Sequence, residues 1–154
     1  MPEGANVFKM KKIFVVATLF LASTRAFCIT TYAMDEFHRM TRVTYDQCAI
    51  NATMAMVSRS DTPYDTQKVK ARSEETVNCV MKSIQISQDS YQKSLASVDQ
   101  MPTVSAMIKE YYSMWTTAIQ QLTTMQTETS DTFYVHRDEA VRKLRQQWER
   151  ITVE

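Results

Sequence analysis

The sequence predicts an all-α fold, an elongated antiparallel bundle of three helices in up-down-up order with coiled-coil-type packing. Gly4 is the only glycine among 154 residues, whereas hairpin turns, strained loops and phosphate-binding loops depend on glycine. Two polar turn segments contain Pro63 and Pro102, and they separate three stretches with apolar residues at helical spacing. The expected domain covers residues 27–154, and its helices span about 34–59, 64–98 and 103–152.

Residues 1–26 have the three-part plan of a cleavable signal peptide. A pair of lysines precedes an apolar run from Ile13 to Ala22, and small and polar residues follow. The run is shorter than the roughly 20 apolar residues of a membrane span, so we expect no stable span after cleavage. Cleavage fits after Ala26 or after Ala33, with the first favoured by leader length, and an uncleaved anchor is the alternative. We therefore expect a periplasmic or secreted protein.

Cys48 and Cys79 are predicted to form a disulfide bond. They are equally distant in sequence from the turn at Pro63, so an antiparallel hairpin brings them to the same height on facing stripes. Disulfides persist in the compartments that exported proteins reach, and closing a loop of about thirty residues adds roughly 3 kcal/mol. The alternative is two reduced cysteines that pack as small apolar side chains. The odd cysteine, Cys28, either stays near the new N-terminus, where it could pair with another chain, or leaves with the leader.

The last expected helix, residues 103–152, has an apolar stripe along its whole length and extends past the hairpin. Two layouts follow. A continuous helix leaves the apolar edge of its end uncovered, whereas a bend within residues 127–132, a run of weak helix formers, creates a fourth helix that packs back on the bundle. The unbroken spacing of Met125, Thr129 and Phe133 favours the continuous helix.

In the continuous layout, residues 133–152 present their apolar edge to a groove or helix of a protein partner. The partner is another protein or a second copy of this chain. The residues expected to make the contact are Phe133, Val141, Leu144, Trp148 and Ile151.

The sequence predicts no catalytic residues, no metal site and no cofactor. His38 and His136 lie roughly 35 Å apart in the continuous layout, and neither belongs to a zinc or haem motif. The acidic pairs Asp35-Glu36, Glu74-Glu75 and Asp138-Glu139 resemble solvated helix faces, because neighbouring side chains on a helix diverge. The net charge of +1, which becomes −2 without the leader, argues against a nucleic-acid-binding protein.

The segment Leu122–Gln126, with the sequence LTTMQ, resembles the Leu-Thr-x-x-Gln motif of small helical periplasmic stress chaperones, and Val43–Gln47 is a looser match. This resemblance implies a periplasmic chaperone or stress sensor, which is the alternative function. The leading expectation is an exported, disulfide-stapled, non-enzymatic protein of the cell envelope or of a secretion or surface assembly. It would act by helix-mediated protein contacts.

Overall fold

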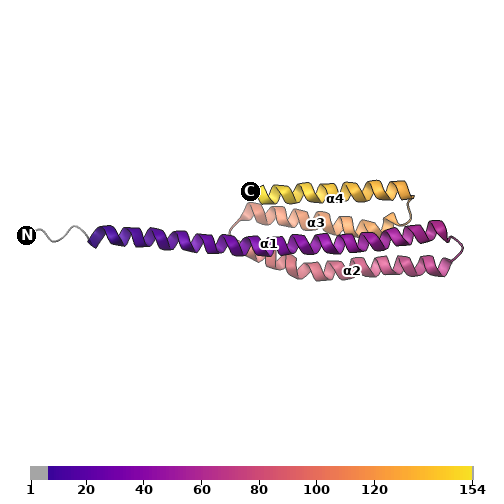
Figure 1. Ribbon diagram of the computed structural model, residues 1–154, viewed down its shortest axis with the longest axis horizontal. Coiled ribbons are helices and arrows are strands. Elements are labelled where there is room, and N and C mark those ends of the chain that lie inside the picture. The colour runs from indigo at the N-terminus through magenta and orange to yellow at the C-terminus, as the bar shows by residue number, and fades with distance from the viewer. Residues whose placement is uncertain (1–6, 154) are drawn as a thin grey trace, which may run out of the picture.

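Over residues 7–153, the computed structural model shows four α-helices that run antiparallel in an up-down-up-down order (Figure 1). The structure describes the backbone of residues 7–153 and the side chains of residues 32–152; the expected signal peptide, residues 1–26, and Cys28 lie outside the described side chains. This part of the chain contains no strand, so the all-α prediction is confirmed. The helices are α1 (Val7–Asp61), α2 (Thr66–Ser97), α3 (Pro102–Met125) and α4 (Ser130–Val153).

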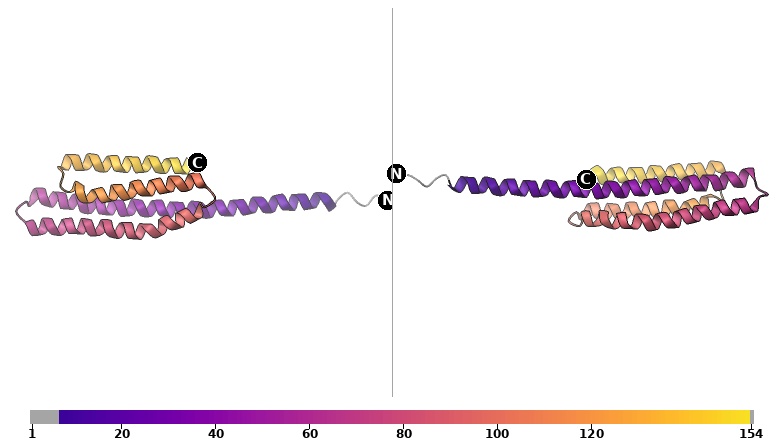
Figure 2. Two further views of the ribbon diagram at one scale, coloured as in Figure 1. Left: turned by 180° about the vertical axis from the view of Figure 1, so that it is seen from behind. Right: turned by 60° about the horizontal axis from the view of Figure 1, so that its bottom comes forward.

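The bundle is formed by the second half of α1 together with the other three helices, as the views in Figure 2 show. The most extensive contact is between α1 and α2. Helix α3 packs on both of them, and α4 packs mainly on α3 while it barely touches α1. The bundle is therefore closed on the α1–α2 side and looser between α1 and α4.

Small side chains explain the close packing of α1 and α2. The buried stripe of α2 advances in steps of four and three residues and is dominated by serine. Its members are Thr76, Val80, Ser83, Ser87, Ser90 and Ser94. The facing side of α1 buries Thr44, Cys48, Ala52 and Ala55. Because the distance between packed helices depends on the side chains at their contact, two small stripes allow the backbones to approach closely.

Large side chains fill the core around α3. Trp115, Ile108, Ile119 and Leu122 of this helix have no exposed surface, and Phe37 of α1 and Phe133 of α4 are equally buried. An aromatic cluster occupies one end of this core, where Phe37 contacts the edge of the Tyr111 ring at 5.7 Å between centroids. A helix with its apolar stripe buried on several neighbours is the central element of such a bundle.

Of the two layouts that the sequence leaves open, the structure has the four-helix one. The helix expected over residues 103–152 ends at Met125, and α4 begins at Ser130. At the break, the side chain of Gln126 donates to the carbonyl of Thr123 at 2.7 Å, so it satisfies an acceptor that the helix end leaves free. The α3–α4 turn is also tied to α1, because the guanidinium of Arg59 donates to the carbonyl of Glu128.

The start of α4 has a capping residue that competes with helix continuation. The hydroxyl of Thr129 accepts a hydrogen bond from the amide of Thr132, at 3.4 Å. Threonine at such a position stabilises a helix start and not a helix interior. Met125 and Phe133 have the apolar spacing that favoured a continuous helix. Both are buried in the same core, because α4 folds back on the bundle.

Candidate functional site

The predicted cysteine pair is found at disulfide distance. The sulfur atoms of Cys48 and Cys79 are 2.06 Å apart, and their Cα atoms are 5.5 Å apart. Cys48 is fully buried in the α1–α2 seam, and its sulfur also lies 3.3 Å from the hydroxyl of Ser83. The bond joins α1 and α2, which have the most extensive contact of any two helices, near the middle of that contact. It would keep these two helices together if the core were loosened.

The residues expected to contact a partner lie largely inside the bundle. Phe133, Leu144, Trp148 and Ile151 are exposed by 0%, 8%, 8% and 3%, and Val141 is partly buried. Trp148 stacks on the ring of His38, with 4.2 Å between ring centroids. The chain itself therefore covers the apolar edge that a continuous helix would have left free.

A second apolar stripe, on the outward side of α1, is exposed instead. Its side chains recur in steps of three and four residues, and we call it the outer seam: Met40, Val43, Gln47, Ile50, Met54 and Val57. Val43, Ile50, Met54 and Val57 are exposed by 50%, 64%, 45% and 39%. The spacing was visible in the sequence, but α1 has two such stripes, and Val43, Ile50 and Val57 lie on the one that faces solvent.

A groove opens between α1 and α4, where these helices barely touch. This α1–α4 groove has a volume of about 460 Å³. Tyr111 and Trp115 of α3 lie beneath it, and Arg42 of α1 and Arg145 of α4 line its two sides. No local sequence pattern indicates the groove, because its lining comes from three helices whose arrangement depends on the α3–α4 turn.

Burial controls the titration of the groove residues. It raises the pKa of Tyr45 and of Tyr111 to about 12. For His38, burial and then the neighbouring charge of Arg42 lower the pKa below its usual value, so the ring is neutral at pH 7. At neutral pH the groove thus contains neutral phenols and a neutral imidazole beside two guanidinium groups.

The hollow between α3 and α4 differs from this groove in its electrostatics. It has a volume of about 480 Å³, but several of its polar side chains pair with one another. His136 lies 2.9 Å from Glu128, and Lys143 lies 2.8 Å from Glu139. Since these groups already have partners, the hollow offers little free binding capacity.

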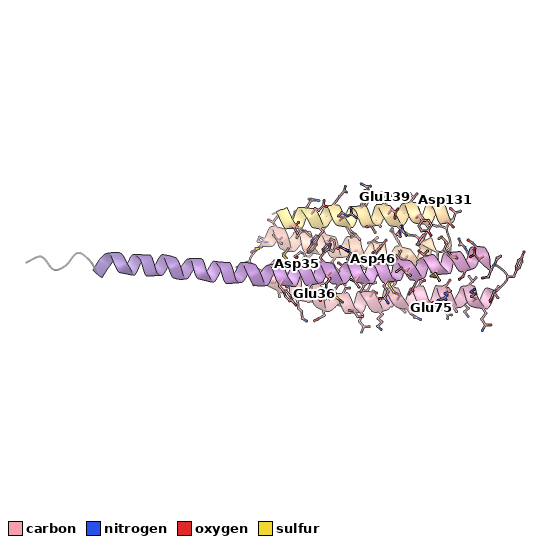
Figure 3. All side chains as sticks on the ribbon, viewed as in Figure 1. Asp35, Glu36, Asp46, Glu75, Asp131 and Glu139 are labelled. Carbon is pink, nitrogen blue, oxygen red and sulfur yellow. A yellow bond between two sulfur atoms is a disulfide. The ribbon has the colours of Figure 1, made fainter. Side chains whose placement is uncertain are left out.

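The carboxylates with described side chains do not gather into a metal site. Figure 3 shows labelled carboxylates spread along the bundle on α1, α2 and α4, with Asp35 and Asp131 far apart. Within the part of the chain that the structure describes, no group of three or more His, Cys, Asp or Glu side chains could hold a metal ion. In the same part, no helix has an apolar stretch of the length that a membrane crossing requires.

Comparison with known proteins adds no assignment. No protein-family model, no curated protein and no solved structure matches this chain. The segment that resembles the stress-chaperone motif, Leu122–Gln126, covers the last turn of α3 and its cap, where Leu122 and Met125 are buried in the core. Packing explains Leu122 and Met125, and helix termination explains Gln126.

Proposed function

We propose that this chain is an exported, non-enzymatic helical protein that acts by helix-mediated contacts within a cell-envelope or secretion and surface assembly. The outer seam of α1 is the observation that supports this function most directly. The cysteine pair supports export, because structural disulfides persist in oxidising compartments and are rare in the cytosol. The contact surface thus moves from α4, where the sequence placed it, to α1.

The outer seam suits an α-helical partner. Alternating steps of three and four residues are the spacing of a coiled-coil seam, in which each apolar side chain fits between four residues of the facing helix. Gln47 is the polar member in the middle of the seam, between Val43 and Ile50. A single polar residue at such a position fixes the register of two helices at some cost in stability.

A second copy of this chain is the partner that the seam itself fits. In an antiparallel pair centred between Gln47 and Ile50, Met40 faces Val57 and Val43 faces Met54. Each long, flexible methionine then opposes a short β-branched side chain, which fills the space evenly. Such a contact has two-fold symmetry, so one patch serves both molecules. Because the seam covers only about five helical turns, we expect a weak, concentration-dependent dimer.

Sedimentation equilibrium tests the seam. The full-length oxidised protein is expected to dimerise, and Ile50→Lys should weaken the dimer about tenfold or more, because it places a charge in the centre of the apolar contact. The matched control is Gln85→Lys on the exposed side of α2, which should dimerise like the wild type. A wild-type protein that stays monomeric at millimolar concentration, or an Ile50→Lys variant that dimerises unchanged, would contradict the proposal.

Cysteine cross-linking tests the orientation. In a Cys28→Ser background, Val43→Cys and Met54→Cys chains should form mixed disulfide-linked dimers when they are combined. Met40→Cys should not link to itself, because the antiparallel register places the two copies of residue 40 about 25 Å apart along the helix axis. Efficient linkage of Met40→Cys to its own copy would show a parallel pair and would contradict the antiparallel arrangement.

A further inference from the structure

The hydroxyl of Tyr45 is buried in the wall of the α1–α4 groove without a hydrogen-bond partner among the described residues. Only 3% of this side chain is exposed. A buried hydroxyl without a partner costs free energy, so most buried polar groups are paired. The other phenol of the groove follows that rule, because the hydroxyls of Tyr111 and Thr41 lie 3.1 Å apart and share a hydrogen bond. Tyr45 is therefore a donor for which the described chain supplies no acceptor.

Two cations of the groove also have no ion-pair partner among the described residues. In the described part of the chain, neither Arg42 nor Arg145 forms an ion pair, whereas Arg39 and Arg72 each pair with a glutamate one helical turn away. Asp46 is the only acidic residue among those that line the groove. The groove thus has an excess of positive charge, and guanidinium groups bind carboxylates with well-defined geometry.

Apart from the charged residues, the lining consists mainly of aromatic and aliphatic side chains. The indole nitrogen of Trp115 already donates to the carbonyl of Thr41 at 2.7 Å, so this buried ring adds no unpaired polar group to the base of the groove. Val141 and Leu144 add apolar side chains along α4. A volume of about 460 Å³ lies within the range of roughly 300–1,000 Å³ that small-molecule sites occupy.

We propose that the α1–α4 groove binds a small flat aromatic carboxylate that has a second polar oxygen. The aromatic body lies against Val141 and Leu144, above the buried rings of Trp115 and Tyr111, and the arginines hold the carboxylate. The second oxygen accepts a hydrogen bond from Tyr45. Such a ligand would pair both arginines and the hydroxyl of Tyr45. This site is separate from the outer seam, so it does not depend on the proposed function.

Titration calorimetry on the full-length oxidised protein tests the site with three probes. The first is the hydroxynaphthoate whose hydroxyl and carboxylate lie at opposite ends of the ring system; naphthoate lacks the hydroxyl, and naphthamide lacks the charge. We expect the hydroxynaphthoate to bind most tightly. Naphthoate should bind about fivefold more weakly and naphthamide at least about tenfold more weakly, because each lacks one polar contact.

Two variants assign these differences to residues. Tyr45→Phe should reduce the affinity for hydroxynaphthoate to that for naphthoate and leave the affinity for naphthoate unchanged. Arg145→Gln should weaken both carboxylates about tenfold and leave naphthamide unaffected. The matched control is Arg142→Gln on the same helix, which is exposed outside the groove and should bind all three probes as the wild type does.

Protein stability provides an independent readout. Because the hydroxyl of Tyr45 has no partner in the described structure, Tyr45→Phe should not lower the melting temperature of the unliganded protein. The proposal is overturned if hydroxynaphthoate does not bind at millimolar concentration. It is also overturned if Tyr45→Phe and Arg145→Gln leave its affinity unchanged, because the ligand would then bind elsewhere.

Discussion

The indole nitrogen of Trp115 donates a hydrogen bond to the backbone carbonyl of Thr41, 2.7 Å away and 74 residues earlier in the chain. Trp115 has no exposed surface, and the hydroxyl of Thr41 shares a second hydrogen bond with Tyr111. Two polar contacts inside an apolar core thus fix the height of α3 relative to α1. They also determine which side chains lie beneath the α1–α4 groove.

Replacing Trp115 by Phe should lower the free energy of unfolding by about 2–4 kcal/mol. The change removes a buried hydrogen bond and leaves a cavity where the larger ring was. Urea unfolding followed by circular dichroism measures the loss. The control is Tyr64→Phe in the exposed α1–α2 turn, where the side chain is 97% exposed and a change within about 0.5 kcal/mol is expected. Equal stability of the Trp115→Phe variant and the wild type would contradict the packing described for α3.

Removal of the cysteine pair should also destabilise the protein. Replacing Cys48 and Cys79 together by alanine should reduce the free energy of unfolding by roughly 3 kcal/mol, since the unfolded chain loses the constraint of a closed loop. Cys28→Ala is the matched control and should unfold like the wild type. If dithiothreitol leaves the unfolding midpoint of the wild type unchanged, the two cysteines are not linked.

Helix α4 is expected to contribute to the core and not to a detachable arm. Leu144→Ala should cost about 2–5 kcal/mol, because the side chain is only 8% exposed. Val135→Ala, at a position that is 64% exposed, is the control on the same helix. A chain that ends at Thr129 should lose cooperative unfolding. If that truncated chain instead unfolds with the wild-type midpoint, α4 is dispensable for the fold.

The two buried phenols predict a loss of stability at alkaline pH. Burial raises the pKa of Tyr45 and Tyr111 to about 12, whereas an unfolded tyrosine titrates near 10. Between these values the unfolded chain has released the protons that the folded chain keeps, so the free energy of unfolding falls as pH rises from about 10 to about 12. Denaturant unfolding across this range measures the slope. Tyr45→Phe should make the slope shallower, and a slope that this variant leaves unchanged would exclude Tyr45 as a source.

The parts of the structure that depend on turn positions could be predicted from the sequence. The pairing of Cys48 with Cys79 required only a turn at Pro63 and the rise of a helix. The break between α3 and α4 could not be predicted in the same way, because Met125, Thr129 and Phe133 keep one spacing whether the helix continues or folds back. The burial of Trp148 follows from that break. The partner surface expected on residues 133–152 assumed a continuous helix, whereas the structure has a separate α4.

The outer seam and the groove illustrate a second limit. Helix α1 buries small side chains such as Ala52 and exposes larger ones such as Ile50. Hydrophobicity alone favours the opposite arrangement. The groove has no local signal at all, since Tyr45, Trp115 and Arg145 converge only after three helices are placed.

Intact-mass analysis and non-reduced peptide mapping of the natural protein test most directly the claim that this is an exported, stapled bundle. We expect a chain that begins after Ala26 or Ala33, with a peptide in which Cys48 is linked to Cys79. A natural product that retains residues 1–26 and has both cysteines as free thiols would contradict the proposed export and the staple together.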